Sequence, residues 1–240
     1  MSNNYFQFKQ FIIKQDACAM KVTTDACLFG AWAAVKMQNE TDKINKVLDI
    51  GTGTGLLSLL LAQKNTTAII DAVEIDESAA IQAQQNFQAT TWGKRLQVFT
   101  TSIQRFSHSS LYDFIITNPP FFNNDLPSEN DKRNLALHSK ALTLEELIQA
   151  IKINLSPNGK FAILLPYHRT ESFIQLAAKH FFYVEEKVMV KQTDKHDYFR
   201  SMLLFGKEIV SIKLQEIIIK QNETYSNEFK NLLSDYYLHL

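Results

Sequence analysis

The sequence predicts an α/β protein built on a doubly wound, mostly parallel sheet. From residue 46 onward, short apolar runs alternate with helical segments, and a glycine-rich turn joins the first run to the first helix. Strands that are joined through helices run parallel, and the helices then cover both faces of the sheet. A length of 240 residues with 45% apolar residues suits one large domain. We expect this domain at 46–240, behind an N-terminal extension at 1–45.

The first part of the domain predicts a βαβα unit. KVLDI (46–50) is an apolar run that ends at a glycine, and the leucine-rich segment 56–64 follows it as a helix. AIIDAVEI (68–75) is the second strand. Asp76 is a suitable N-cap for a helix that runs to Ala89, with small alanines along it.

The middle of the chain continues the alternation. RLQVFTT (95–101) and YDFIIT (112–117) are the third and fourth strands. Segment 142–155 has apolar residues at helical spacing, and we expect Pro157 with the following Asn-Gly pair to end it. KFAILLP (160–166) is the fifth strand.

The last part predicts one more helix and two or three strands. The helix spans 170–180, and strands are expected at about 182–191 and 199–206, with a further one at about 209–219. A long polar loop at about 121–141 interrupts the alternation, and loops of this length inside a compact domain are often functional.

Composition excludes several classes of protein. The formal net charge is zero, so any nucleic-acid contact must use a local patch. The N-terminus lacks a signal-peptide core, and the densest aliphatic stretch, Leu56 to Ala62, is too short to cross a bilayer. Cys18 and Cys27 form no CxxC pair, and the histidines are scattered. We expect a cytoplasmic monomer that binds neither a membrane nor a metal.

The stretch DIGTGTG (49–55) predicts a ligand at the end of the first strand. Its glycines, Gly51, Gly53 and Gly55, permit a tight turn and a close backbone approach. A dinucleotide fingerprint, GxGxxG, would need a glycine where this chain has Leu56. The GxGxG form resembles the first motif of S-adenosylmethionine-dependent methyltransferases. That resemblance implies the Rossmann-like class I fold with seven strands, and S-adenosylmethionine as the cofactor.

Further residues are expected to bind this cofactor at neighbouring strand ends. Glu74 ends the second strand, where a carboxylate can accept hydrogen bonds from both ribose hydroxyls, and Ile75 follows it. Asp49 can tie down the loop, orient the ammonium group of the cofactor, or do both. Ser102 and Ile103 follow the third strand, where methyltransferases often place an acidic residue facing the adenine. Ser102 departs from that habit.

The stretch NPPFF (118–122) follows the fourth strand and resembles the (N/D)PP(F/Y) motif of enzymes that methylate planar nitrogens. A ring-conjugated amine is a poor nucleophile, and two hydrogen-bond acceptors on its N–H groups stabilise the positive charge that arrives. We assign these acceptors to the Asn118 side chain and the Pro119 carbonyl, with Asn118 also bordering the cofactor. Phe121 would stack on the substrate, beside Phe122. No Pro-Cys dipeptide occurs, which argues against methylation of pyrimidine carbon 5.

Three segments outside these motifs narrow the substrate. FKQFIIKQDACAMKVTTDACLFGAWA (8–33), DYFRSMLLFGK (197–207) and ETYSNEFKNLLSDYYLHL (223–240) resemble the bacterial tRNA(Val) adenosine-37 N6-methyltransferase family. The resemblance implies in-line transfer of a methyl group to N6 of the adenine beside the anticodon of a valine tRNA. That base lies in a single-stranded loop, so turning it outward costs little.

The same resemblance implies that the extension closes over the cofactor, with Lys21, Thr24 and Asp25 near its methionine end. Thr24 and Asp25 could equally cap the helix that follows them. RNA contacts would come from basic residues of the long loop and the last strands, chiefly Arg133, Lys191 and Arg200. Other lysines that could join them are Lys132, Lys140, Lys187 and Lys195.

Alternatives to this interpretation remain. An enzyme of the same chemistry could methylate a glutamine amide of a protein, although that family usually has Tyr at the position of Phe121 and a helical N-terminal domain longer than residues 1–45. Methylation of guanine N2 in RNA typically accompanies a duplicated domain. A non-catalytic RNA-binding scaffold with the same fold would not need Asn118 and the glycine loop.

Overall fold

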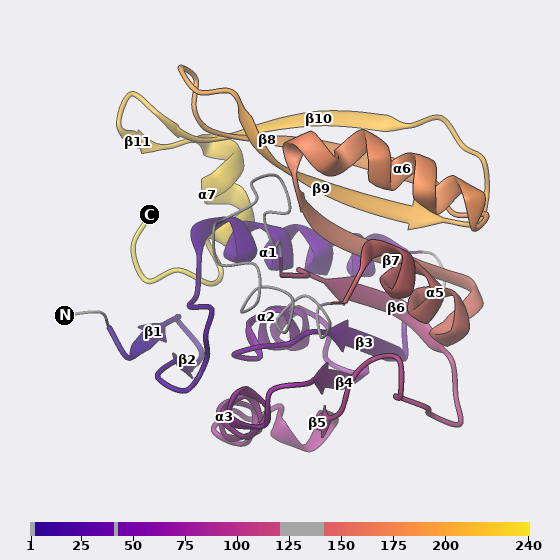
Figure 1. Ribbon diagram of the computed structural model, residues 1–240. Coiled ribbons are helices and arrows are strands. Elements are labelled where there is room, and N and C mark those ends of the chain that lie inside the picture. The colour runs from indigo at the N-terminus through magenta and orange to yellow at the C-terminus, as the bar shows by residue number, and fades with distance from the viewer. Residues whose placement is uncertain (1–2, 41–42, 121–141) are drawn as a thin grey trace, which may run out of the picture.

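The computed structural model of the protein describes residues 3–40, 43–120 and 142–240. Their centre is a nine-stranded sheet in the order β11-β10-β8-β9-β7-β6-β3-β4-β5, which runs from β10 at the top of Figure 1 to β5 at the bottom. The strands of this sheet are β3 (Lys46–Ile50), β4 (Ile69–Glu74), β5 (Leu96–Thr100), β6 (Tyr112–Thr117), β7 (Leu155–Pro166), β8 (Tyr183–Thr193), β9 (Tyr198–Gly206), β10 (Lys213–Gln221) and β11 (Thr224–Tyr225).

The predicted fold class is confirmed. Strands β3 to β7 pair in parallel, whereas β9 runs antiparallel to both β7 and β8. The sheet has two strands more than the seven expected. β10 pairs in parallel with β8, and the short β11 turns back along β10. These additions cover the edge of β8, which would otherwise leave its backbone groups unpaired.

Helices cover both faces of the sheet because successive strand residues point to opposite sides. Val47 and Ile116 belong to one apolar core, with α1, α2 and part of α3. Leu48 and Ile115 belong to the other, with α5 and α6. The helices are α1 (Thr24–Asn39), α2 (Leu56–Lys64), α3 (Glu77–Gln88), α5 (Leu144–Asn154), α6 (Thr170–Lys179) and α7 (Asn227–Leu233), with 3₁₀ turns η1 (Gly93–Arg95) and η2 (Tyr167–Arg169).

Local capping fixes where several helices begin. The expected N-cap of α3 is confirmed, because the Asp76 side chain accepts a hydrogen bond from the Ala79 backbone N–H at 2.8 Å. Thr143 and Glu146 form a capping box at the start of α5, in which each side chain accepts a backbone N–H of the other residue. Such caps satisfy N–H groups that have no partner within the helix.

The expected turn after α5 is wrong. α5 ends at Asn154 and β7 begins at Leu155, so Pro157 and the Asn-Gly pair after it lie within the strand. β7 pairs Leu155 with Tyr112 and then Lys160 with Phe114, so extra residues of β7 bulge between the two pairings. A bulge accommodates a proline because residues there need not donate to the neighbouring strand.

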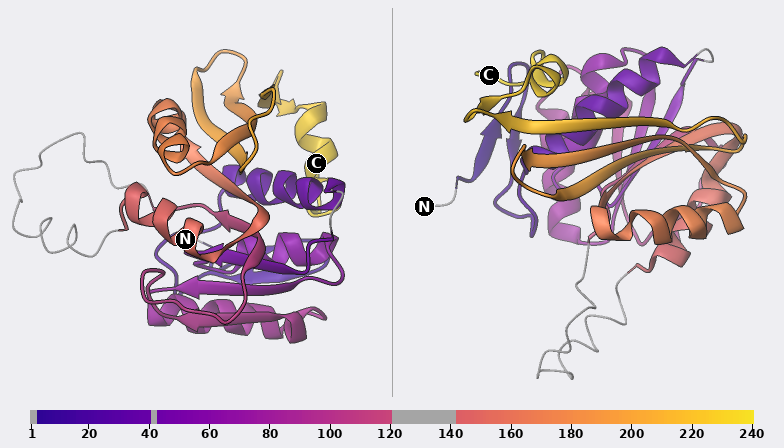
Figure 2. Two further views of the ribbon diagram at one scale, coloured as in Figure 1. Left: turned by 90° about the vertical axis from the view of Figure 1, so that its right-hand side faces the viewer. Right: turned by 90° about the horizontal axis from the view of Figure 1, so that it is seen from above.

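The two ends of the chain lie against each other. A hairpin of β1 (Tyr5–Gln7) and β2 (Ile12–Lys14) is followed by α1, and α7 packs beside α1 (Figure 2). Lys9 donates its backbone N–H to the Tyr236 carbonyl at 2.8 Å. The Tyr236 hydroxyl in turn donates to the Leu60 carbonyl of α2 at 3.0 Å. The hairpin, the C-terminal tail and α2 therefore form one packed unit.

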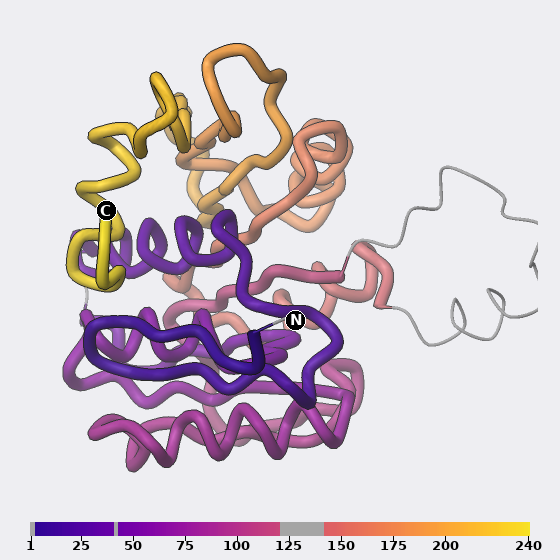
Figure 3. The backbone as a smooth tube through the Cα atoms, turned by 90° about the vertical axis from the view of Figure 1, so that its left-hand side faces the viewer, coloured from indigo at the N-terminus to yellow at the C-terminus, as the bar shows by residue number. Residues whose placement is uncertain are grey.

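Asn86 of α3 ties the hairpin to the glycine turn. Its Oδ1 accepts the Lys14 N–H at 3.0 Å, and its Nδ2 donates to the carbonyls of Lys14 and Thr54, each at 2.9 Å. Figure 3 shows the N-terminal segment crossing the face of the molecule that contains the left-hand strand ends of Figure 1. Asn86 therefore holds the hairpin and the turn after β3 in a fixed relation.

Asn86→Ala is expected to lower the free energy of unfolding by about 2–4 kcal/mol, because it leaves the Lys14 N–H and two carbonyls without their partner. Urea unfolding followed by circular dichroism measures this change. Gln85→Ala, on the exposed side of the same helix, is the control and should change stability by less than about 0.5 kcal/mol. Equal stability of the two variants would contradict the bridging role of Asn86.

Candidate active site

The glycine turn between β3 and α2 has the geometry that its sequence predicts. Gly51, Gly53 and Gly55 have φ values of 73°, 55° and 83°, which disfavour other residues. A Cβ on Gly55 would lie 2.5 Å from the Phe87 ring, whereas a Cβ on Gly51 or Gly53 would meet no atom within 4 Å. The turn is therefore packed on its α3 side and open where the first two glycines lie.

Glu74, at the end of β4, holds this turn through its carboxylate. Oε2 accepts the Gly53 N–H at 2.9 Å, and Oε1 accepts the backbone N–H groups of Ile75 and Asp76 at 2.9 and 3.0 Å. The Gly51 N–H donates to the Val73 carbonyl at 2.8 Å. The end of β4 thus fixes the glycine turn from the side, and the Glu74 carboxylate, which is only partly buried, faces the open part of the turn.

Asp49 lies beneath the turn and is fully buried. Its Oδ2 accepts hydrogen bonds from the hydroxyls of Thr52 and Ser58, both at 2.7 Å. Its Oδ1 is buried without a hydrogen-bond partner in the described part of the chain. Burial raises the pKa of Asp49 to about 6, although the two hydroxyls oppose this rise.

The end of β6 brings Asn118 beside the glycine turn. Thr117 pairs with Ile50 across the two parallel strands, and its hydroxyl donates to the Ile50 carbonyl at 2.9 Å. Asn118 and Gly51 are the next residues of the two strands, so they leave the sheet side by side. Asn118 is partly buried, Pro119 is buried and Pro120 is exposed. Phe121 and Phe122 lie outside the described residues.

The third predicted strand end lies next to Glu74. Glu74 pairs with Thr100 of β5, and the Thr101 N–H donates to the Glu74 carbonyl at 2.9 Å. Ser102 follows and is partly exposed, whereas the Ile103 side chain is buried in the core under α5 and α6. Ile75 is 62% exposed, so its side chain is available to a ligand at this edge.

The N-terminal segment contributes residues that the sequence did not single out. Cys18 is buried, and burial raises the pKa of its thiol to about 11, with smaller contributions from the negative charges of Glu74, Asp76 and Asp16. Gln82 of α3 accepts the Ala17 N–H at 3.1 Å and donates to Asp16 at 2.7 Å. Residues 16–18 therefore lie over α3, close enough for Glu74 to act on Cys18.

The sequence of α3 contains a signal for its contact with residues 16–18. Gln82 and Asn86 are polar residues spaced by four on α3, and both are buried on the same side as Ala79 and Ala83. Two buried amides on an otherwise small apolar face require partners from another segment. The helix pattern alone does not say which segment supplies them.

At the start of α1 the structure separates the expected residues. The N-cap is Thr23, whose hydroxyl accepts the Ala26 N–H at 3.4 Å, so capping by Thr24 and Asp25 is wrong. Asp25 instead pairs with Arg200 of β9, whose Nε donates to its Oδ2 at 2.8 Å. Lys21 is exposed and Thr24 is partly buried.

The basic residues that were expected to contact RNA are distributed unevenly. Lys191 lies 3.5 Å from Glu216, and Lys187 pairs with Glu171 at 2.5 Å. Lys195 is exposed in the turn after β8. Lys132, Arg133 and Lys140 fall outside the described residues. The charges of Lys187 and Lys191 are therefore compensated by neighbouring carboxylates.

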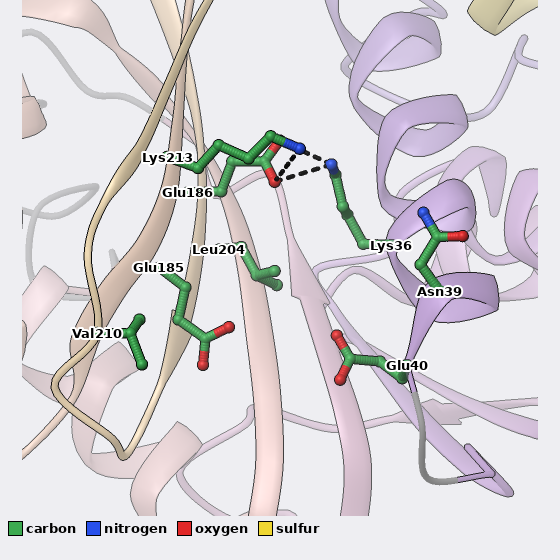
Figure 4. A pocket seen from close by; sticks show the side chains of 8 residues that line it. All are labelled: Lys36, Asn39, Glu40, Glu185, Glu186, Leu204, Val210 and Lys213. Atoms are coloured by element: carbon green, nitrogen blue, oxygen red, sulfur yellow. Dashed lines mark hydrogen bonds and ion pairs between the residues drawn. The ribbon is translucent and has the colours of Figure 1, made fainter.

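A cavity of about 300 Å³ lies between the end of α1 and strands β8 to β10, away from these strand ends. Figure 4 shows Glu186 between Lys36 and Lys213, and Glu186 also accepts a hydrogen bond from Trp32 at 3.2 Å. Asp25 lies at the end of α1 near the candidate site, and Lys36 lies near the opposite end of this helix, where it lines the cavity. The cavity is therefore at the opposite ends of the strands. Its buried charges are paired with each other, and it does not belong to the candidate site.

Two other kinds of site were sought in residues 3–40, 43–120 and 142–240. No group of three or more His, Cys, Asp or Glu side chains within them is arranged to hold a metal ion. None of their helices has the length and apolar character to span a membrane.

Comparisons with known proteins identify close relatives. The methyltransferase small domain family matches residues 33–193. A tRNA1(Val) (adenine(37)-N6)-methyltransferase of Dyadobacter fermentans is 43% identical over 98% of both chains, and one of Flavobacterium johnsoniae is 39% identical over 97% of this chain and 99% of its own. A crystal structure from Agrobacterium tumefaciens, described as a predicted O-methyltransferase, aligns with a TM-score of 0.67 at 14% identity, over 88% of this chain and 96% of its own.

The raised pKa of Asp49 predicts a change of stability with pH. Between about pH 4 and 6 the folded chain keeps a proton that the unfolded chain releases, because the pKa rises from 3.8 to about 6 on folding. The free energy of unfolding therefore falls as the pH rises through that window, by about 3 kcal/mol in total. Asp49→Asn cannot titrate at this position and does not lose this stability, so the variant should gain stability relative to the native chain between pH 4 and 7.

Urea unfolding at several pH values measures the difference between the two proteins. Asp194→Asn, an exposed change in the turn after β8, is the control and should follow the native profile. Parallel profiles of Asp49→Asn and the native chain would show that Asp49 does not titrate in this range.

Proposed function

The chain belongs to the family of tRNA1(Val) (adenine(37)-N6)-methyltransferases, and from that membership we propose that it transfers a methyl group from S-adenosylmethionine to the exocyclic N6 of adenosine 37 in tRNA1(Val). The structural observation that supports this most is the pairing of β3 with β6, which sets Asn118 beside the glycine turn. For direct transfer, the residue that binds the target amine and the loop that binds the methyl donor must be neighbours.

The residues around the glycine turn fit S-adenosylmethionine, whose sulfonium supplies an electrophilic methyl group when it is bound. The space beyond Gly51 and Gly53 admits a ligand against the backbone. The Glu74 carboxylate would accept hydrogen bonds from the ribose hydroxyls. The Asp49 Oδ1, which has no partner among the described residues, would accept a hydrogen bond from the ammonium group at the methionine end. Ile75, Ser102 and Ile103 would surround the adenine, with Ile103 contributing through the packing beneath it.

Asn118 and Pro119 would bind the target amine. The Asn118 side-chain oxygen and the Pro119 carbonyl accept its two N–H groups, which favours a pyramidal nitrogen and stabilises the charge that forms on it. Prolines at 119 and 120 hold this segment in an extended conformation and bring no N–H donors of their own. The methylated nitrogen is acidic and loses its proton to water. Phe121, beside Phe122, would stack on the adenine plane.

The N-terminal extension would complete the cofactor site. We propose that residues 1–45 form a unit that closes over it, with Lys21, Thr24 and Asp25 near the methionine end, because residues 16–18 already lie near Glu74. The pairing of Asp25 with Arg200 supports a role of both residues in holding this unit against β9. Arg200 would then influence RNA binding through the position of the extension as well as by its charge.

The substrate is a tRNA, as the names of the relatives indicate, and we propose the anticodon loop of a valine isoacceptor. Relatives at 36–43% identity over their full lengths carry this one name, which favours adenine over glutamine amides or guanine N2. A tRNA-modifying enzyme acts where tRNA is, so we place it in the cytoplasm, as a monomer. Of the basic residues, Arg133 remains a proposed direct RNA contact, whereas the charge of Lys191 is already compensated by Glu216.

Incubation with S-adenosylmethionine and tRNA from cells that lack this gene should produce N6-methyladenosine at position 37 of the valine tRNA. Nucleoside mass spectrometry and mapping of the modified position measure it. Asn118→Ala should slow transfer by about 10²-fold while retaining cofactor affinity, by analogy with the loss of one oxyanion donor. Asn118→Asp, which keeps an acceptor oxygen, should retain more activity than Asn118→Ala.

Asn158→Ala, at an exposed asparagine in the bulge of β7, is the matched control and should be fully active. Normal transfer by Asn118→Ala would rule out the acceptor role. A modified glutamine or guanine in place of adenosine would rule out the proposed substrate.

Glu74→Ala should weaken S-adenosylmethionine binding by about tenfold or more, because it removes the ribose acceptor and the partner of the Gly53 N–H. Isothermal titration calorimetry measures the affinity. Glu77→Ala, an exposed carboxylate in the first turn of α3, keeps the native affinity and controls for loss of negative charge. Unchanged affinity of Glu74→Ala would remove this residue from the cofactor site.

A further inference from the structure

Two tyrosines form a partly exposed aromatic pair at the ends of β7 and β9. Tyr167 follows the last residue of β7 and Tyr198 is the first residue of β9. Their ring centroids lie 4.9 Å apart, with the planes tilted by 43°. Both side chains are partly exposed, and tyrosine rings are enriched at interfaces.

The neighbours of Tyr198 hold this pair rigidly. The Lys191 ammonium lies 4.6 Å from the centre of the Tyr198 ring, and the Tyr198 hydroxyl donates a hydrogen bond to Glu216 of β10. Glu216 also pairs with Lys191, at 3.5 Å. Tyr198 is thus contacted from the two strands β8 and β10, and its ring lies against that of Tyr167. A ring with a fixed orientation loses little entropy when it contacts a ligand.

The pair lies on the same edge of the sheet as Asn118. β6 and β7 are parallel neighbours in which Thr117 pairs with Ile163, and Pro166 lies three residues farther along β7. Tyr167 therefore lies roughly 10 Å beyond the level of Asn118, one strand away. The turn that joins β8 to β9 lies on the same side of the molecule as the N-terminal hairpin (Figure 1). About three stacked nucleotides span this distance, at about 3.4 Å each.

Charge and ring chemistry together indicate the ligand class. Lys191 is compensated by Glu216 and Arg200 by Asp25, so these two cations are poor partners for phosphates, whereas Arg169 and the exposed Lys195 also lie near the pair in the chain. The net charge of the chain is also zero. Contacts to the bases would therefore supply a large part of the binding of an RNA here. Unpaired bases stack on aromatic side chains, and this is how proteins commonly hold single-stranded RNA.

We propose that Tyr167, backed by Tyr198, is a stacking site for an unpaired base of the anticodon loop, within about three nucleotides of the methylated adenosine. This inference rests on the proposed function for the identity of the RNA. Lys191 and Glu216 are positioning residues in this arrangement, because they act through the orientation of Tyr198. Stacking at Tyr167 would hold the loop while Asn118 binds the extruded adenine.

The test is the binding of a fluorescently labelled valine anticodon stem-loop, measured by anisotropy with S-adenosylhomocysteine present, beside methylation kinetics on the same RNA. Tyr167→Ala should weaken binding by roughly 10- to 100-fold. It should raise KM by a similar factor and leave kcat and cofactor affinity unchanged. Tyr167→Phe, which keeps the ring, should bind almost as the native chain does.

Tyr183→Ala is the matched control, because Tyr183 is a partly exposed tyrosine at the other end of β8. It should bind the stem-loop normally. Native binding by Tyr167→Ala overturns the inference, as does equal weakening in Tyr167→Phe and Tyr167→Ala, or a native chain that does not bind the stem-loop. If binding depends on the Tyr167 ring but no adenosine is methylated, the stacking site stands and the proposed function fails.

Discussion

The parallel pairing of β3 with β6 is the constraint on which the rest of the site depends. It sets Ile50 against Thr117, and the Thr117 hydroxyl locks the register by donating to the Ile50 carbonyl. A slip by one residue would turn every side chain of β6 to the other face and remove Ile116 from the core that it shares with Val47. Because both strands are buried on two faces, this register is strongly specified. The place where Gly51 and Asn118 meet is therefore set by core packing.

Around the place where Gly51 and Asn118 meet, the chain has features that lower its stability and that a ligand would use. Three glycines have left-handed backbone angles, and Asp49 is buried with one oxygen unpartnered in the described part of the chain. A buried carboxylate with an unpartnered oxygen costs free energy, and the flexible glycines need neighbouring contacts to hold one conformation. Glu74 and the hairpin supply that support, the first through the Gly53 N–H and the second through Asn86. The glycine turn and the N-terminal hairpin are thus held by one connected set of hydrogen bonds.

The sequence predicted the regular part of this structure well, and physical reasons explain the remainder. β3, α2 and β6 occupy the expected ranges, because apolar runs and the glycine turn mark their ends. The bulge of β7 was missed because Pro157 and Asn-Gly normally signal a turn, and only the pairing with β6 reveals the strand. The pair of Asp25 with Arg200 joins residues 175 positions apart, and local patterns contain no information about such a contact. The stacking role of Phe121 stays a prediction.

The charge pairs change how substrate binding must be understood. Counting Lys191 and Arg200 as RNA contacts assumes that their charges are available, whereas each has a carboxylate partner. Releasing either cation to a phosphate would leave Glu216 or Asp25 facing the RNA, so the exchange would gain little electrostatic free energy. Stacking on the Tyr167 ring does not require an ion pair to be broken, because Tyr198 is held at its hydroxyl and Tyr167 lies against it. An electrically neutral chain can therefore bind a loop of RNA through base stacking, which also brings an unpaired adenine within reach of Asn118.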